Sequence, residues 1–533
     1  MSPAATGVFR EQVVPGAPGG ASEVVGSGYY AYWFTEFDTN RIGMLTRDGQ
    51  FQEFIVPTPD SGPHGIALNW RDGAIWFTEL NAGKIGRLTR DGAFSEFPIP
   101  TLQSAPWGIV CLDDIWFTES AANKLGRVNA DGSITEFSIP SANANPRGIS
   151  DSTYHVPCFA EFAADRIGCL ENGKVVERVL APGSGPFSLC RDRNGDLWFV
   201  EQTANRIGWV SFNGARSLAE TKLEEFSIPT PESEPADIVS DAWGGVWFSE
   251  KAAGQVGYVS GGRVTEFPLP DRSSQPTGVS LSVFGAEVLE SRANRLTEVQ
   301  PDVVVVAGAG VSGSWTTKLE VANASDRPGF VFAGAYPRPS TISLEGHPPE
   351  AGASLAAHGS GQIDVGRSVV DSLYTFYVRG PEEGVLPSVH ARISNDKSPT
   401  QSADLPSIRL STLTNLNPSN LVFPGVIREG SARTNLLISE LSPEDGDFAP
   451  QPLVVPVRVD LFGADGTPLA SEELRIGAGR TLYLVDVVGL LGVATLPIGQ
   501  IRVTKLGDHG VIWGYLAKID SEGAVSIFSG QNP

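Results

Sequence analysis

The stretch Ile75-Trp-Phe-Thr-Glu79, followed by Lys84-Ile-Gly-Arg87 and Phe94-Ser-Glu-Phe-Pro-Ile-Pro100, decides the fold, because these three phrases recur along the first 300 residues. The glutamate that ends the first phrase returns every 40 to 49 residues, at Glu36, Glu79, Glu119, Glu161, Glu201, Glu250 and Glu290. This spacing accommodates four short strands in each copy. A single four-stranded unit cannot bury its own faces, whereas a radial ring of such units can. The repeat therefore predicts an all-β chain in which residues 1–302 form a seven-bladed β-propeller.

The ring is expected to close through the N-terminal segment. Phe9-Arg-Glu-Gln-Val-Val-Pro15 matches the third phrase, but it precedes the first copy of the other two. The last copy, around Glu290, has no clear third phrase of its own. We therefore expect the N-terminal strand to complete the last blade, which removes an exposed sheet edge.

Beyond Val303 the repeat stops, and segments such as 315–321 and 457–462 alternate apolar and polar residues, as half-buried strands do. We predict two β-sandwich (Ig-like) domains, at 303–402 and 405–533, joined by the Ser/Pro-rich linker 397–404. By analogy, such domains are spacers or adhesive surfaces. Gly308-Ala-Gly-Val-Ser-Gly313 formally matches a dinucleotide fingerprint, but a strand pattern follows where that motif needs a helix. No nucleotide cofactor is expected.

Charge and hydropathy limit the partners. The chain has 61 acidic and 39 basic residues and a net charge of −22. This is the wrong sign for neutralising phosphate, so no nucleic acid partner is expected. No apolar run approaches the about 18 residues that a membrane helix needs, so the chain is not expected to be transmembrane. The first residues do not form a signal peptide. Two locations stay open: extracytoplasmic (periplasmic, cell-surface or secreted), with the signal absent from this chain, or cytoplasmic.

Two of the four cysteines stand at facing positions of one repeat. Cys158 takes the tryptophan position of the first phrase, and Cys169 lies eleven residues on, across the hairpin. Facing residues of an antiparallel pair are close enough for a disulfide. The alternative is a pair of buried free thiols. A disulfide would imply an oxidising compartment.

A Pro-x-Gly-like turn precedes each Trp-Phe-Thr-Glu strand and leads into the innermost strand of a blade. The x residues are Gly19, His64, Trp107, Arg147, Phe187, Ala236 and Thr277. Because x varies on a constant frame, we expect these side chains to face a ligand at the mouth of the channel. Trp107, Arg147 and Phe187 would place aromatic faces beside a guanidinium, which suits a planar, anionic or peptide-like ligand.

The seven repeat glutamates are expected to have a structural role. Each precedes a tight turn, where a carboxylate can accept backbone N–H bonds. The alternative is an acidic ring that attracts cations. Glu250 is the exception, because a second carboxylate, Glu234, stands sixteen residues before it. Two carboxylates without a third protein ligand would make a weak, water-rich Mg²⁺ or Ca²⁺ site.

The phrases quoted at the outset resemble the repeat of the streptogramin B (virginiamycin B) lyase family, over about residues 8–300. The resemblance implies a seven-bladed propeller that opens a cyclic depsipeptide by Mg²⁺-assisted elimination. It also implies a Glu-Pro-His turn, a glutamate on the following strand, and a second histidine one blade earlier. In this chain the turn is Glu234-Pro-Ala236 and the following glutamate is Glu250, so these two glutamates are the expected metal ligands.

The histidines implied by the resemblance are absent. Ala236 stands where the base is expected and Phe187 where the second histidine is expected, and neither side chain can accept a proton. His64 occupies the same turn position in the second copy. It is a candidate base for a relocated site, and the alternative is a neutral imidazole bonded to a loop carbonyl.

The main functional prediction is a lyase-like propeller that binds a ligand or partner and lacks the catalytic histidines. Loss of a general base typically costs about 10²- to 10⁴-fold in rate. One alternative is an active Mg²⁺-dependent C–O lyase whose base is not located. Another is a structural or assembly subunit that uses the propeller as a scaffold. The expected partner is a small-molecule or peptide-like ligand, or another protein at the propeller face or the sandwiches.

Overall fold

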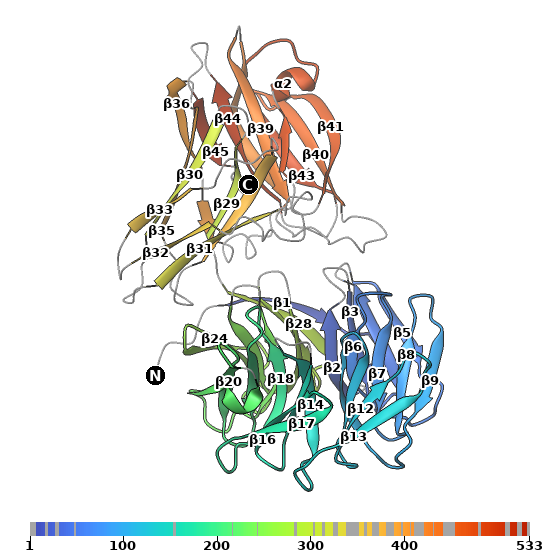
Figure 1. The fold of residues 1–533 in the computed structure, drawn as a ribbon. Helices are drawn as coiled ribbons and strands as arrows, with labels where there is room; N and C mark the ends of the chain where they lie inside the picture. The colour runs from blue at the N-terminus through green and yellow to red at the C-terminus, as the bar shows by residue number, and fades with distance from the viewer. Residues whose placement is uncertain are drawn as a thin grey trace. The chain divides into compact units, whose positions relative to one another are not determined.

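The computed structural model describes residues 7–300 except 16–19, 27–30, 47–48, 153–155, 216, 242–243 and 282–284, together with the strands of 301–533 and parts of their connections. The chain divides into two compact units, Met1–Gln300 and Pro301–Pro533, each of which is built from strands (Figure 1). In the described residues the helices are a 3₁₀ turn, η1 (Leu218–Glu220), and one short α-helix, α2 (Val487–Leu490). Neither of these could span a membrane.

The first unit contains seven four-stranded antiparallel sheets, which form the blades of a propeller. Blades 1 to 4 are β2 (Ala21–Gly26), β3 (Ala31–Glu36), β4 (Arg41–Thr46) and β5 (Phe51–Ile55); β6 (Pro63–Leu68), β7 (Ile75–Glu79), β8 (Lys84–Leu88) and β9 (Phe94–Pro98); β10 (Pro106–Cys111), β11 (Ile115–Glu119), β12 (Lys124–Val128) and β13 (Ile134–Ser138); and β14 (Pro146–Asp151), β15 (Pro157–Glu161), β16 (Arg166–Glu171) and β17 (Lys174–Val179). Blades 5 to 7 are β18 (Pro186–Arg191), β19 (Leu197–Glu201), β20 (Arg206–Ser211) and β21 (Lys222–Ser227); β22 (Pro235–Ser240), β23 (Val246–Glu250), β24 (Gln255–Ser260) and β25 (Arg263–Pro268); and β26 (Pro276–Leu281), β27 (Ala286–Glu290), β28 (Arg295–Pro301) and β1 (Gly7–Val13).

The propeller closes through its N-terminal strand. Strand β1 pairs with β28 as the outermost strand of blade 7, and the innermost strand of each blade contacts that of the next, including β26 with β2. The amide of Val14 donates to the carbonyl oxygen of Asn294 at 2.9 Å, and Asn294 Nδ2 donates back to the carbonyl oxygen of Val14 at 2.9 Å. Arg295 pairs with Glu11 at 3.0 Å. The last blade is therefore built from both ends of the unit.

The glycine of the second phrase is required by the phenylalanine of the first. Phe77 and Gly86 face each other across β7 and β8, and a Cβ on Gly86 would overlap the ring of Phe77. The same pairing recurs in the other blades except blade 7, where Val288 faces Thr297. A valine side chain is smaller than a phenylalanine ring and leaves room for the threonine. The two phrases are thus the two halves of one packing unit.

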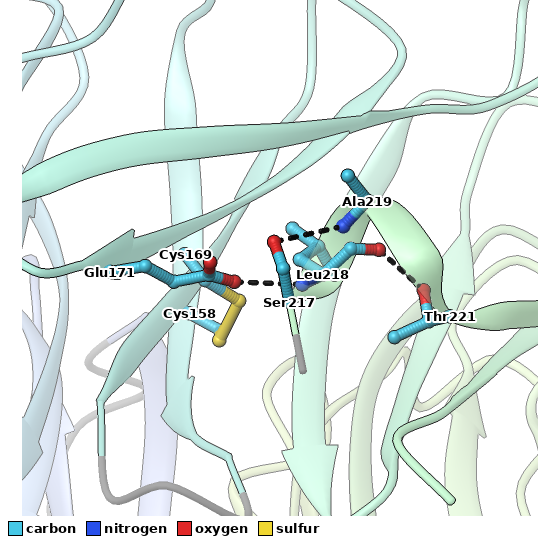
Figure 2. Close-up of a disulfide and its surroundings, with 7 residues drawn as sticks. All are labelled: Cys158, Cys169, Glu171, Ser217, Leu218, Ala219 and Thr221. Atoms are coloured by element: carbon cyan, nitrogen blue, oxygen red, sulfur yellow. Dashed lines mark hydrogen bonds between the residues drawn. A yellow bond between two sulfur atoms is a disulfide. The ribbon is translucent and has the colours of Figure 1, made fainter. Parts of the chain in front are cut away.

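Blade 4 replaces an aromatic stack with a disulfide. In blades 1, 2, 3, 5 and 6 the tryptophan of the first phrase packs on a phenylalanine of the outermost strand, as Trp76 does on Phe97 with ring centroids 5.4 Å apart. In blade 4 Cys158 and Cys169 face each other and are bonded, with their Cα atoms 4.0 Å apart (Figure 2). Both residues are fully buried. Figure 2 shows Glu171 beside the bond, where its Oε1 accepts the amide of Leu218 at 2.7 Å.

The described strands of the second unit form four antiparallel sheets. They are ordered β32-β31-β34-β29-β37, β33-β30-β35-β36, β38-β43-β40-β41 and β42-β39-β44-β45. The strands are β29 (Val304–Val311), β30 (Trp315–Ala322), β31 (Gly329–Tyr336), β32 (Ala351–Leu355), β33 (Ser360–Asp364), β34 (Ser372–Arg379), β35 (Ser388–Asn395), β36 (Ser398–Leu405), β37 (Ser407–Arg409), β38 (Asn420–Arg428), β39 (Arg433–Glu440), β40 (Val454–Gly463), β41 (Pro468–Gly477), β42 (Thr481–Leu484), β43 (Leu496–Lys505), β44 (Ile512–Ile519) and β45 (Val525–Ser529). The last two sheets share one buried apolar core, to which Val457, Ile501 and Leu516 belong.

The predicted linker 397–404 is wrong. Strand β36 occupies this segment and pairs with β35, and the next strand, β37, pairs with β29. The segment therefore belongs to the sheets that precede it. Its composition misled the prediction because β36 is an edge strand, where proline and polar residues are tolerated on the side without a partner strand. An Ig-like identity for the C-terminal sheets stays a prediction.

Candidate functional site

Seven equivalent turns lead the chain into the innermost strands. The residue two positions before x has a positive φ in blades 2 to 7, including Ala105 at 49°, Glu234 at 52° and Gln275 at 55°. Residues other than glycine rarely adopt this left-handed backbone conformation. The turn is therefore imposed by the blade architecture, and the x residues emerge at equivalent places around the channel.

The threonine of the first phrase positions the x residue of the next blade. Thr78 Oγ1 accepts the amide of Gly65 at 2.8 Å in its own blade and donates to the carbonyl oxygen of Trp107 at 2.9 Å. Thr118 Oγ1 likewise donates to the carbonyl oxygen of Arg147 at 2.6 Å. Each hydroxyl thus joins two neighbouring inner strands and holds the backbone from which an x side chain projects.

Blade 1 requires a correction to the predicted turn alignment. Ala21 pairs with the repeat glutamate of its blade, as the turn proline does in the other blades. Ser22 therefore stands at x, and Gly19 lies outside the described residues. The next residue, Glu23, was missed because the Pro-Gly-Gly sequence at 18–20 imitates the turn three residues too early.

The predicted mouth residues form one aromatic cluster around a guanidinium. The ring centroids of His64 and Trp107 lie 4.0 Å apart, and those of Trp107 and Phe187 lie 6.0 Å apart. The guanidinium carbon of Arg147 lies 3.7 Å from the centroid of Trp107 and 5.6 Å from that of Phe187. A further ring, Phe162, lies 5.4 Å from the same carbon. The structure brings together four x residues from blades 2 to 5 and adds Phe162, which follows a repeat glutamate.

A cavity of about 320 Å³ opens beside this cluster. Its wall includes the rings of His64, Trp107 and Phe187 and two carboxylates, Glu23 and Asp237. Ligand sites typically combine an apolar, aromatic wall with a few convergent polar groups, at volumes of about 300–1,000 Å³. The cavity is therefore the candidate functional site of the propeller.

The two carboxylates occupy equivalent positions, one residue after x, where four other blades have glycine. Each accepts a hydrogen bond from a backbone amide of the inner strand of the next blade. The amide of Ile66 donates to Glu23 Oε2 at 3.3 Å, and the amide of Val279 donates to Asp237 Oδ2 at 2.8 Å. Burial raises the pKa of both groups, and the charge of Asp237 raises the pKa of Glu23 further. This pair was not predicted from the sequence, because it lies one position after x, outside the two variable positions of the turn.

His64 has an imidazole that is neutral near pH 7, because burial lowers its pKa to about 4. Its Nδ1 lies 3.7 Å from Glu23 Oε1, beyond hydrogen-bonding distance. That nitrogen is buried and has no hydrogen-bond partner among the described atoms. A neutral imidazole is in the form that accepts a proton, but its low pKa makes it a weak base.

The expected metal ligands lie in different environments. Glu250 is fully buried, its Oε2 accepts from Gln255 Nε2 at 3.0 Å, and burial raises its pKa to about 8. Glu234 is exposed at the turn, and its carbonyl oxygen accepts the amide of Lys251 at 3.1 Å. Within the described residues, no group of three or more His, Cys, Asp and Glu side chains could hold a metal ion. The side chains of Glu234 and Glu250 do not by themselves fit a magnesium site.

The repeat glutamates are buried inside the blades, and those that accept hydrogen bonds, Glu36, Glu201, Glu250 and Glu290, accept them from side chains instead of hairpin amides. Arg206 Nη2 donates to Glu201 Oε2 at 2.6 Å, and Arg295 Nη2 donates to Glu290 Oε2 at 2.9 Å. Burial raises the pKa of Glu119 to about 8. In blades 2 to 4 neither carboxyl oxygen of Glu79, Glu119 or Glu161 has a hydrogen-bond partner among the described atoms.

The propeller region matches known proteins. A family model described as the virginiamycin B lyase family matches residues 4–220. The solved structure of selenomethionine-substituted virginiamycin B lyase from Staphylococcus aureus is 30% identical, with a TM-score of 0.52, and the match covers 55% of this chain and 99% of that chain. A streptogramin B lyase structure is 29% identical, with a TM-score of 0.51, over 55% of this chain and 97% of the other.

A third match is a catalytically inactive histidine-to-alanine variant of the S. aureus enzyme, solved with quinupristin. It is 29% identical, with a TM-score of 0.51, over 55% of this chain and 99% of the other. A search of curated protein sequences gave no match.

Proposed function

Since this chain belongs to the virginiamycin B lyase family, we propose that its propeller binds a small-molecule or peptide-like ligand at the mouth cavity without opening it. One observation carries the proposal: Phe187 and Ala236 line the cavity at the two positions where the family resemblance expects histidines. Neither can accept a proton, and loss of a base typically costs about 10²- to 10⁴-fold in rate. A histidine-to-alanine change also leaves the S. aureus enzyme catalytically inactive.

The aromatic wall supports a binding role. Trp107 and Phe187 line the cavity, and the guanidinium of Arg147 lies over the indole ring of Trp107 in a cation–π contact, 3.7 Å from its centroid. Aromatic faces contribute a large contact area with little loss of side-chain freedom. Because Trp107 contacts both His64 and Phe187, the wall is held together before a ligand arrives.

The test is incubation of the full chain with quinupristin, with and without Mg²⁺, followed by mass spectrometry of the compound. We expect the compound to stay intact. Calorimetric titration should show binding that Trp107→Ala weakens by about tenfold or more, the usual effect of removing an aromatic anchor. Trp70→Ala is the matched control, because Trp70 is 55% exposed and does not line the cavity. Ring-opened product, or binding unaffected by Trp107→Ala, would contradict the proposal.

A second candidate is a Mg²⁺-dependent C–O lyase that uses His64 as a relocated base. The observation in its favour is that His64 lines the same cavity and has a buried, unpartnered Nδ1 among the described atoms. In that case His64→Gln would abolish ring opening. A structural or assembly role, with the propeller face or the C-terminal sheets as a protein-binding surface, would appear as a partner that copurifies from the native cell.

We also propose an extracytoplasmic location. The support is the Cys158–Cys169 disulfide, since disulfides persist in oxidising compartments and are rare in the cytosol. Non-reducing mass spectrometry of the protein from its native cell tests this. Finding both thiols free there would favour the cytoplasmic alternative.

A further inference from the structure

The charges at the mouth cavity are uneven. The titratable side chains that line it are Glu23, His64, Asp237 and Lys251. His64 is neutral near pH 7 because burial lowers its pKa to about 4. The guanidinium of Arg147 stacks among the rings of the aromatic cluster, and Arg147 is not among the described residues that line the cavity. The lining thus carries two carboxyl groups and one lysine, and the guanidinium of Arg147 lies 3.7 Å from the centroid of the Trp107 ring, which belongs to the same wall.

Glu23 retains an oxygen for a ligand. Its Oε2 accepts the amide of Ile66 at 3.3 Å, whereas its Oε1 lies 3.7 Å from His64 Nδ1 without a hydrogen bond between them. The side chain keeps 31% of its surface exposed although it lies in the wall of the channel. Asp237 is held more firmly, because Ser188 Oγ and two strand amides donate to its oxygens. Glu23 is therefore positioned to contact a ligand, and Asp237 to add negative charge behind it.

The occupant that this pair of carboxyl groups favours is a cation, because an ammonium group that donates hydrogen bonds to them stabilises their charged form, which the empty cavity disfavours. Burial raises the pKa of both carboxyl groups, and for Glu23 the charge of Asp237 adds to the effect. A positive group between them would offset this repulsion. Arg147 already makes cation–π contacts with Trp107 and Phe187, so these two rings add apolar surface to the cavity wall and no further cation–π site. The same rings would bury the apolar body that carries such a group.

We propose that the mouth cavity recognises a small organic amine with an aromatic or apolar body, whose ammonium group is bound by Glu23 with Asp237 as the second carboxylate. This inference rests on the proposed ligand-binding function and names the class of ligand. The x residues of the sequence suggested a planar, anionic or peptide-like ligand. We now favour an amine, because the guanidinium of Arg147 packs among the rings of the aromatic cluster and does not line the cavity.

The test compares three probes that share a benzene ring and differ in charge: phenethylamine, 2-phenylethanol and 3-phenylpropanoate. Calorimetric titration of the full chain should show saturable binding of phenethylamine that is at least tenfold tighter than that of either other probe. Glu23→Gln should weaken phenethylamine binding about tenfold and leave 2-phenylethanol binding unchanged. Glu232→Gln is the matched control, because this exposed glutamate lies at the mouth-side turn of blade 6 and does not line the cavity.

Each outcome decides between the two proposals. Equal affinity for the three probes, no binding of any probe, or equal behaviour of Glu23→Gln and Glu232→Gln would overturn the amine assignment. If all three probes bind equally well and Trp107→Ala abolishes their binding, the amine assignment is wrong and the proposed ligand-binding function still holds. Ring opening of quinupristin would overturn the proposed function and leave charge-selective probe binding as a separate result. Thermal unfolding of Glu23→Gln, expected within a few degrees of the parent chain, confirms that the variant is folded.

Discussion

Removing the disulfide of blade 4 should weaken the propeller by several kcal/mol. The perturbation is the double variant Cys158→Ala/Cys169→Ala. The bond links residues separated by eleven positions, and a cross-link over a loop of that length stabilises by about 3 kcal/mol through the entropy of the unfolded chain. Both cysteines are fully buried in a cluster with Leu197 and Phe199, so removal of the two sulfur atoms also leaves space in the core. The cross-link contribution alone corresponds to a fall of about 6–12 °C in Tm, at about 2–4 °C per kcal/mol.

The assay is thermal unfolding of the full chain by calorimetry under oxidising conditions. Cys190→Ala is the matched control, because Cys190 is a buried cysteine without a disulfide. The control should shift the propeller transition much less than the double variant does. In parallel, alkylation of the denatured, unreduced parent chain should label two cysteines, Cys111 and Cys190.

Two results would refute the reasoning. Alkylation of all four cysteines without reductant would show that the bond is not formed. If the double variant unfolds at the same temperature as the Cys190→Ala control, the stability of blade 4 does not depend on the cross-link. The first result would also remove the support for an oxidising compartment.

Three further predictions concern the propeller. Deletion of residues 1–15 removes β1 and the hydrogen bonds between Val14 and Asn294, so it should lower the propeller Tm by calorimetry; an unchanged transition would contradict closure by β1. Gly126→Ala places a methyl group in the ring of Phe117 and should cost about 1–3 kcal/mol in denaturant unfolding, whereas a neutral effect would show that the ring can move aside. The pKa of Glu119 is about 8 in the folded state and 4.5 in its usual environment. Between these pH values the folded chain holds a proton that the unfolded chain releases, so the free energy of unfolding falls as the pH rises from about 4.5 through 8. The free energy of unfolding of Glu119→Gln, measured by urea unfolding, should therefore rise relative to that of the parent by up to about 3 kcal/mol between pH 5.5 and 8. If the variant and the parent show the same pH dependence, the pKa of Glu119 is not raised.

Features that repeat within a blade could be predicted from the sequence. The period of the glutamates indicates seven four-stranded units, and a missing third phrase in the last copy points to the N-terminal strand. The pairing of Cys158 with Cys169 follows from two substitutions at facing positions. These inferences succeed because the partners lie on neighbouring strands, where the register of one hairpin determines which side chains meet.

Predictions failed where local composition resembled a different structure. Segment 397–404 has the composition of a linker but is the edge strand β36. The Pro-Gly-Gly sequence at 18–20 looks like the blade turn, and this concealed Ser22 and Glu23. The repeat glutamates stand beside tight turns, yet their side chains lie inside the blades. In each case the strand pairing decides the role, and composition alone does not reveal it.

By itself the sequence determined the seven blades, the closure of the last blade by the N-terminal strand, and the absence of histidine at positions 187 and 236. Only the tertiary structure decided which blades share a site. Glu23 and Asp237 lie more than 200 residues apart and line one cavity, and Arg147 is surrounded by rings from blades 3 to 5. The physical reason is that the repeat defines contacts within a blade, whereas contacts across the channel arise when the ring closes and brings distant inner strands together.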